Sequence, residues 1–174
     1  SIDGGGNVLI GKTVTSANTA GVQLEAAGVG VFTMDGDVSG IFNRKTSNGQ
    51  VVQFRKDNTT VGSVSVTGSS TAYNTSSDYR LKENVTDITD ATTRLKQLNP
   101  VRFNFIADED ITVDGFLAHE VQNVVPEAIT GTKDAVDSEG NPVYQGIDQS
   151  KLVPLLVKTI QELEARIATL ENAQ

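Results

Sequence analysis

Residues 76–85 have the sequence SSDYRLKENV and lie where the composition of the chain changes. Before this point, residues 1–76 contain 5 Lys and Arg against 5 Asp and Glu, and they hold 12 of the 16 glycines. After it, residues 77–174 contain 9 basic against 17 acidic residues, together with all four prolines. Because glycine, proline and charge all shift at one place, we predict a domain boundary between Ser76 and Ser77.

The composition of the whole chain excludes several classes of protein. It has 174 residues, no Cys and a formal net charge of −8. Without Cys there is no disulfide or thiolate metal site, and the single histidine, His119, gives no His-based cluster, so we expect no metal and no cofactor. The acidic run at residues 108–110 is expected to be a solvated turn. The negative charge argues against nucleic acid, and the short apolar runs and the absence of a signal-peptide pattern predict no membrane insertion.

Short β-type runs separated by turn residues occupy the first part of the chain. They lie at residues 7–10, 30–34, 40–43, 51–54 and 61–66. Large apolar side chains are too few for a self-contained sandwich, and such a chain usually buries its strands against other chains. Disorder is the alternative, because Gly, Ser, Thr and Asn make up 37 of these 76 residues. The alternating valines of residues 61–66 favour order, so we predict the end of an intertwined fibre.

The second part has the mixed pattern of an α+β domain. Apolar spacing predicts a helix over residues 84–98, which ends before Asn99 and Pro100. Residues 101–105 alternate as a strand, and residues 115–118 look like a strand that leads into a short helix over residues 119–125. Turn residues at 137–142 predict a hairpin.

The C-terminal segment, about residues 150–172, has the pattern of a coiled-coil helix. Its apolar residues recur with the spacing 3-4-3-4-3 and form a stripe that we call the seam: Val153, Leu156, Ile160, Leu163, Ile167 and Leu170. A single apolar stripe often packs on its own domain, but one this strict and narrow favours self-association. Branched residues at one seam position and Leu at the other lean toward two strands, so the spacing alone does not decide between dimer and trimer.

Residues 6–13, GNVLIGKT, match the phosphate-loop pattern G-x-x-x-x-G-K-[ST]. That loop needs a buried strand before it and a helix after it. Only five residues precede Gly6, and residues 14–21 do not have a helical pattern. We therefore interpret the match as a strand that ends in a turn.

Ser77 and Lys82 are candidates for a serine nucleophile and its base. A serine becomes a nucleophile when a neighbouring base takes its proton, and a lysine serves as that base when burial or a nearby cation lowers its pKa. Arg80 is a candidate for this second cation. By pattern alone a solvated linker explains the same residues, because Ser near Lys is common.

Three ordered motifs closely resemble the intramolecular chaperone domain of phage endosialidases, tail spikes and tail fibres, the peptidase S74 family. Its opening pattern S-D-x-R-x-K-x-x-[IV] is present from Ser77 to Val85. Residues 98–103, LNPVRF, look like its L-x-P-V-x-[FY] element. Residues 115–128, GFLAHEVQNVVPEA, are similar to G-[FV]-[IL]-A-Q-E-V-x-x-x-x-P-E, with His119 where the family usually has Gln. The closing helix also fits, so the resemblance covers residues 77–174.

This resemblance implies a trimerisation chaperone that helps three chains find register and then cuts itself off in front of the motif serine. Carried over, the cut falls between Ser76 and Ser77, with Ser77 as the nucleophile and Lys82 as the general base. The candidates for supporting this site are Asp78, Arg80, His119 and Glu120. The enzyme would be a single-turnover serine endopeptidase that acts only on its own chain.

The resulting prediction is an α+β homotrimer with two parts. Residues 1–76 form a fibre end of the triple β-helix or β-prism type, and residues 77–174 form the chaperone domain. The predicted partners are two further copies, the upstream fibre domains and, through the fibre, a host receptor. The predicted location is the virion tail fibre or spike, with the released chaperone in the host cytoplasm.

Two alternatives to this function remain from the sequence. The first is a permanent, uncleaved fibre tip that binds a host receptor. The second is a module that releases a non-viral protein, since membrane-tethered transcription factors also resemble this family. The glycine-rich first part argues for a fibre over this second alternative.

Overall fold

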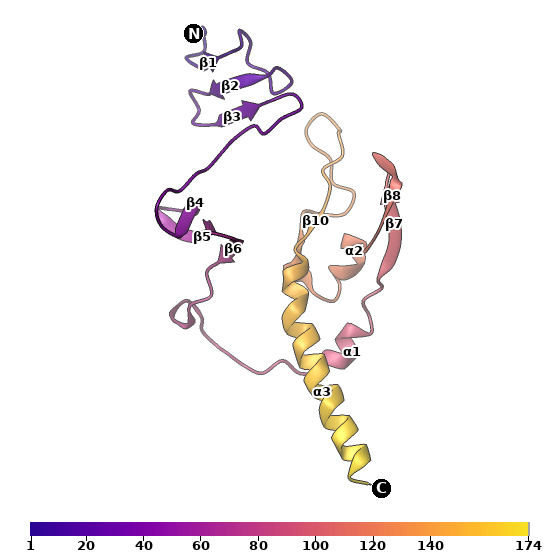
Figure 1. The fold of residues 1–174 in the computed structure, drawn as a ribbon. Coiled ribbons are helices and arrows are strands. Elements are labelled where there is room, and N and C mark those ends of the chain that lie inside the picture. The colour runs from indigo at the N-terminus through magenta and orange to yellow at the C-terminus, as the bar shows by residue number, and fades with distance from the viewer. Residues whose placement is uncertain (174) are drawn as a thin grey trace. The chain divides into compact units, whose positions relative to one another are not determined.

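The computed structural model describes residues 1–173, so residue 174 of the predicted second part lies outside the described residues. The chain divides into two compact units, Ser1–Glu83 and the remainder from Asn84 onward. The first unit is formed almost entirely by strands, and the second combines helices with strands. The chain as a whole is therefore of the α+β class (Figure 1).

The first unit consists of two antiparallel three-stranded sheets, each with its strands in chain order. The first sheet contains β1 (Val8–Ile10), β2 (Gly21–Leu24) and β3 (Gly30–Thr33). The second contains β4 (Gly49–Lys56), β5 (Thr59–Val66) and β6 (Thr71–Thr75). Asp57 and Asn58 join β4 to β5 with φ of 48° and 64°, the conformation that a two-residue hairpin turn requires.

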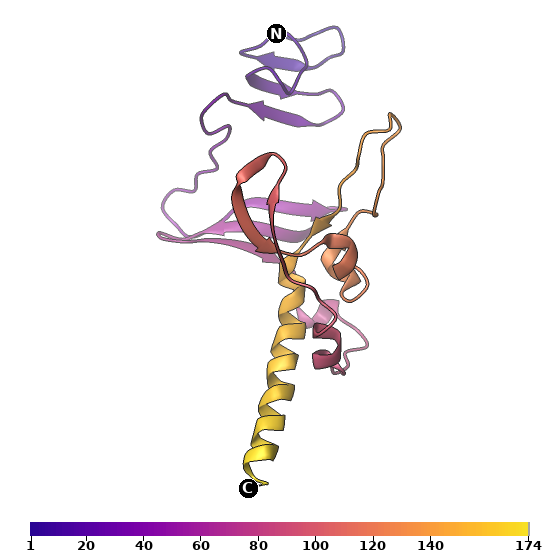
Figure 2. The ribbon, with the colours of Figure 1, turned by 90° about the vertical axis from the view of Figure 1, so that its right-hand side faces the viewer.

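The second unit alternates short helices with small antiparallel pairs of strands. β7 (Val101–Phe105) pairs with β8 (Asp108–Gly115), and β9 (Ile129–Thr130) pairs with β10 (Gly146–Ile147). Figure 2 shows the β7–β8 hairpin as a twisted ribbon. The helical elements are α1 (Ala91–Leu95), α2 (Ala118–Val121), η2 (Pro126–Ala128), η3 (Gln149–Leu152) and α3 (Val153–Glu171).

The core of the second unit lies where α1, α2 and η2 meet the beginning of α3. Its buried apolar residues are Ala91, Val121, Val124, Val125, Ala128, Leu152 and Leu155. α1 packs along α3, as both views show (Figures 1 and 2). The predicted C-terminal helix is thereby confirmed, since η3 and α3 together cover residues 149–171.

The helix predicted over residues 84–98 is wrong for most of its length, because only Ala91–Leu95 is α-helical. Asn84 and Asp90 have φ of 52° and 55°, in the left-handed region, whereas a right-handed helix needs φ near −63°. Val85, which fitted the apolar spacing, is 81% exposed. The apolar residues before Asp90 therefore do not lie on a helix, although Ile88 packs against the core.

Two further local expectations are corrected. Residues 108–110 are the first residues of β8 and not a turn; the turn lies at residues 106–107, one step earlier. Residues 40–43 contain no strand, and the side chains of Ile41 and Phe42 are exposed. The structure also contains two strands that were not predicted from the sequence, β2 and β6.

Candidate functional site

Ser76 stands directly after β6, at the end of the second sheet. Its backbone N–H donates to the carbonyl oxygen of Val61 at 3.2 Å, and its hydroxyl donates to the same oxygen at 3.3 Å. These bonds extend the β5–β6 pairing by one residue beyond Thr75. The carbonyl side of the predicted cleavage point is therefore attached to a sheet.

Ser77 and Lys82 lie within hydrogen-bond distance, with the Lys82 ammonium donating to Ser77 Oγ at 2.9 Å. The 3₁₀ helix η1 (Tyr79–Leu81) separates them and folds the chain back on itself. Leu81 N–H donates to the Asp78 carbonyl at 3.1 Å, and Lys82 N–H donates to the Tyr79 carbonyl at 3.1 Å. A turn of this length brings residues five positions apart together.

Asp78 caps the N-terminus of η1 and pairs with Arg80. Its Oδ1 accepts from the backbone N–H of Arg80 and from Arg80 Nε, each at 2.9 Å, and its Oδ2 accepts from Arg80 Nη2 at 2.8 Å. The guanidinium of Arg80 lowers the pKa of the Asp78 carboxyl, and the charge of Lys82 lowers it further. The same pairing raises the pKa of Arg80.

The structure thus brings together four of the residues named from the sequence: Ser77, Asp78, Arg80 and Lys82. His119 and Glu120 lie in α2 of the second unit. There the Asn99 side-chain amide donates to Glu120 Oε2 at 3.3 Å, and the Asn123 amide donates to the His119 carbonyl at 3.4 Å. Within this unit both residues therefore have structural hydrogen-bond partners.

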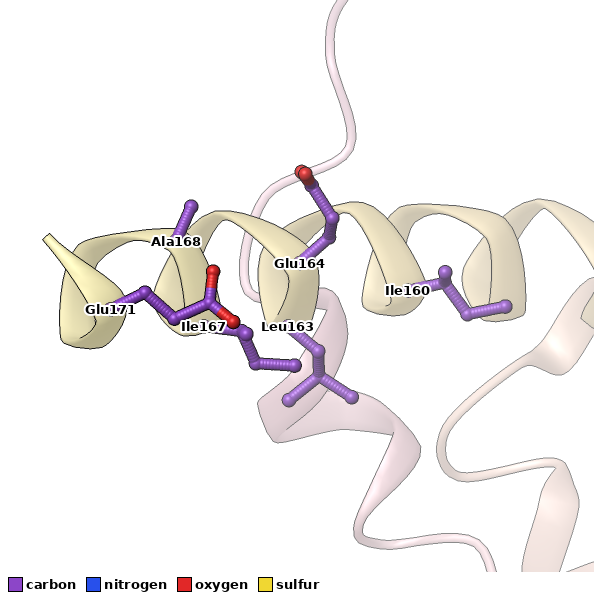
Figure 3. Close-up of a pocket in the computed structure, with 6 residues that line it drawn as sticks. All are labelled: Ile160, Leu163, Glu164, Ile167, Ala168 and Glu171. Atoms are coloured by element: carbon purple, nitrogen blue, oxygen red, sulfur yellow. The ribbon is translucent and has the colours of Figure 1, made fainter.

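The seam residues are all exposed on the single chain, from 41% for Leu163 to 67% for Leu170. The side chains of Leu163 and Ile167 project from the same side of α3 and line a shallow groove on its surface (Figure 3). α3 packs on its own unit through a different stripe, with Leu155 and Thr159 buried. The apolar seam is thus additional to the face that the core already uses.

Glu162 continues the buried stripe of α3 and was not foreseen from the sequence. Its carboxylate accepts from the backbone N–H groups of Ala91 at 3.2 Å and Thr92 at 2.9 Å, and from Thr92 Oγ1 at 2.6 Å. It therefore caps α1, whose own N-cap residue, Asp90, makes no side-chain capping bond. The spacing of Leu155, Thr159 and Glu162 could have indicated this second stripe. Each of these residues precedes a seam residue by one position.

The lysine of the phosphate-loop match at residues 6–13 has a structural role. Lys12 is buried, and its ammonium donates to the carbonyl oxygens of Ser16 at 2.7 Å and Thr19 at 3.4 Å. These bonds hold the β1–β2 connection. Residues 8–10 of the motif are strand β1, as the sequence indicated.

Residues 1–173 contain no group of three or more His, Asp or Glu side chains placed to hold a metal ion. Within the same range, no helix combines the length and the hydropathy that crossing a membrane requires. The chemistry that the arrangement offers is that of a hydroxyl next to an amine, the pairing of a nucleophile with a general base.

Known proteins are similar to parts of this chain. Residues 77–130 match the family model described as Peptidase_S74, chaperone of endosialidase. About 100 residues, 55% of this chain, are 35% identical to the long tail fiber protein Gp37 of Enterobacteria phage K3, and equally to that of Enterobacteria phage T2. The match covers 8% and 7% of these relatives, so this chain spans a small part of their length.

These matches bear on the second part of the chain that the sequence predicted. Residues 77–130 are similar to the chaperone of endosialidase family, and the resemblance predicted from the sequence motifs is confirmed over this range. About 100 residues of the chain are also similar to phage long tail fibre proteins.

Proposed function

We propose that this chain is a self-cleaving trimerisation chaperone together with the fibre end that it folds. The observation that carries the proposal is the 2.9 Å hydrogen bond between Lys82 Nζ and Ser77 Oγ, in the segment that begins the match to the chaperone family. Ser77 is the nucleophile, Lys82 the general base, and the bond cut is the peptide bond between Ser76 and Ser77.

The chemistry requires Lys82 to be neutral when it acts. Its amine takes the proton from Ser77 Oγ, which attacks the Ser76 carbonyl carbon. The proton passes to the amide nitrogen of Ser77 as the peptide bond breaks, which leaves an ester between Ser76 and Ser77 Oγ. Water then hydrolyses this ester and gives the Ser76 carboxylate and the free hydroxyl of Ser77, so the net reaction consumes one water.

Assembly into a homotrimer is the second part of the proposal. The exposed seam on α3 supports it, because an apolar stripe of this length on a terminal helix is stabilised by the same stripe on other copies. The first unit adds a further argument, since Leu9 is its sole buried apolar side chain among the described residues. Strands with so little internal burial gain stability when they pack between chains.

Trimerisation and cleavage fit together as one folding device. Strands that pair between chains must be brought together from distant positions before their contacts form. This costs conformational entropy, and the resulting barrier makes such folding slow. A trimerising helix raises the local concentration of the other two chains and so lowers this barrier. Removing the helper afterwards leaves a fibre that is kinetically trapped. We place folding and release in the host cytoplasm and the finished fibre, of the triple β-helix or β-prism type, in the virion tail.

The test is the intact mass of freshly expressed protein after denaturation. We expect two fragments from the wild type that meet at Ser76 and Ser77, with masses that sum to the chain plus one water. Ser77→Ala and Lys82→Ala should each give a single full-length chain that still assembles as a trimer. The matched control is Ser76→Ala, which removes the neighbouring hydroxyl and should still be cut.

A full-length wild type in a well-folded trimer would overturn the cleavage proposal and favour a permanent fibre tip that binds a host receptor. A well-folded monomer would overturn both cleavage on assembly and the fibre tip. Cleavage that survives Ser77→Ala would locate the nucleophile elsewhere.

A further inference from the structure

The two residues of the dyad stand on either side of η1, so whatever shapes this turn also sets their distance. Ser77 precedes the N-cap residue Asp78, and Lys82 is the C-cap residue. The cap bond from Arg80 N–H to Asp78 Oδ1 closes the first part of the turn, and the bond from Lys82 N–H to the Tyr79 carbonyl closes the last. The dyad geometry therefore depends directly on Asp78.

Asp78 is also within electrostatic range of the Lys82 ammonium, and its carboxylate holds the Arg80 guanidinium. The two are joined at two points, by Arg80 Nε to Oδ1 at 2.9 Å and Arg80 Nη2 to Oδ2 at 2.8 Å. The pKa of Asp78 is lowered by Lys82 as well as by Arg80, which places this carboxylate within the electrostatic range of the amine. A carboxylate favours a neighbouring ammonium, and a guanidinium disfavours it.

We propose that Asp78 and Arg80 are positioning residues that hold the η1 turn and set, with opposite sign, the pH at which Lys82 can accept the Ser77 proton. This inference rests on the proposed function and adds a regulator to the same site. In the intact pair the two charges largely compensate each other. Removing either charge alone leaves the other to act on Lys82.

The charged residue that follows Lys82 in the chain, Glu83, is unchanged in all the variants below. Differences between variants therefore report the Asp78–Arg80 pair.

Asp78→Asn and Arg80→Gln each remove one charge of the pair while a side chain that can cap the turn stays at position 78. Asn is as good an N-cap residue as Asp, so Asp78→Asn keeps the turn while it leaves the Arg80 charge uncompensated. The pH midpoint of cleavage should fall by about half a pH unit at low salt, a roughly threefold gain in rate below the midpoint. Arg80→Gln leaves the carboxylate uncompensated, so the midpoint should rise by a similar amount.

Two variants distinguish this electrostatic effect from a merely structural one. Asp78→Glu keeps the charge but caps poorly, so it should have the wild-type midpoint with a lower maximal rate. The matched control is Arg102→Gln, which breaks a second exposed Arg–Asp pair, Arg102 with Asp114 at 2.7 Å, and should leave the midpoint unchanged.

The experiment separates folding from chemistry with a photocaged serine at position 77. The full chain assembles uncut, is purified, and is transferred to buffers between pH 6 and about pH 11, near the ordinary lysine range. Light then releases Ser77, and mass spectrometry of denatured samples follows the two fragments with time. Raised salt should reduce the shifts, because the groups are exposed.

Opposite shifts of the midpoint in Asp78→Asn and Arg80→Gln support the inference. Identical midpoints, or shifts of the same sign, overturn it while leaving the Ser77–Lys82 mechanism standing. Failure of the uncaged wild type to cut itself overturns the proposed function directly, and this inference with it. For variants that assemble poorly, NMR titration of Lys82 in the uncut Ser77→Ala trimer gives the same comparison without any cleavage.

Discussion

The two compact units differ in where their apolar side chains go. The second unit buries seven of them in one cluster between α1, α2, η2 and the beginning of α3. The first unit has six strands but buries only Leu9 among the apolar residues of the described chain, while Phe54 and Tyr73 remain 54% and 82% exposed. The second unit therefore has an apolar core of its own, whereas the first has almost none.

The same contrast exists within one helix. One stripe of α3 places Leu155 and Thr159 in the core, and the seam runs beside it along the helix and is exposed, as Figure 3 shows for the C-terminal part of α3. α3 thus packs on its own unit through one stripe and leaves a second, apolar stripe exposed. Each face can be tested without disturbing the other.

The largest expected effect comes from Leu155, which is 3% exposed and stands in the centre of the core. In the uncut Ser77→Ala chain, Leu155→Ala should lower the free energy of unfolding by about 2–5 kcal/mol, because it leaves a cavity in the core of the second unit. Urea unfolding, combined with hydrogen exchange at the α1 and α3 amides, measures this. The control is Ile106→Ala at the 93% exposed tip of the β7–β8 hairpin, which should stay within about 0.5 kcal/mol of the parent.

A Leu155→Ala chain as stable as the control would contradict the difference between the two units, because the stability of the second unit would then not depend on its own core.

The seam should affect association and leave the core intact. Replacing Leu163 and Ile167 together by Asn removes two large apolar side chains from the exposed face, and we expect association to weaken by about two orders of magnitude or more. Light scattering and analytical ultracentrifugation measure the mass, and circular dichroism checks that the helix persists. A matched double substitution off the seam, Arg166→Asn with Thr169→Asn, should leave association near that of the parent.

Unchanged association in the seam variant would show that α3 does not hold the copies together.

The parts of the molecule that could be predicted from sequence are those held by short-range bonds. Ser77 and Lys82 are five residues apart, and the turn that joins them is encoded by the residues between them. The C-terminal helix follows from a spacing that repeats within one segment. In both cases the interacting groups are neighbours in the sequence, so a motif contains the whole interaction.

The parts that could not be predicted depend on contacts between distant residues. The bond from Thr92 to Glu162 spans 70 positions, and nothing around Asp90 indicates that its helix is capped from α3. Likewise, the apolar spacing before α1 predicted a longer helix, because the left-handed backbone at Asn84 and Asp90 has no signal in that spacing. The domain boundary and the catalytic roles stay predictions until cleavage is measured.

The smallest expected effect is that of the long-range cap itself. Hydrogen bonds from Thr92 and Ala91 lower the pKa of Glu162, so the folded unit binds this proton less readily than the unfolded chain does. The stabilisation is therefore present above the ordinary glutamate value of 4.5 and is lost as the pH falls through the lowered folded value. Glu162→Gln should lower the melting temperature by a few degrees at pH 7 and flatten its decline in acid. Thermal unfolding from pH 7 to about pH 3 tests this. The control is Glu164→Gln, which changes an exposed neighbour on α3. If the melting temperatures of both variants and the parent decline in parallel in acid, the cap adds no stability.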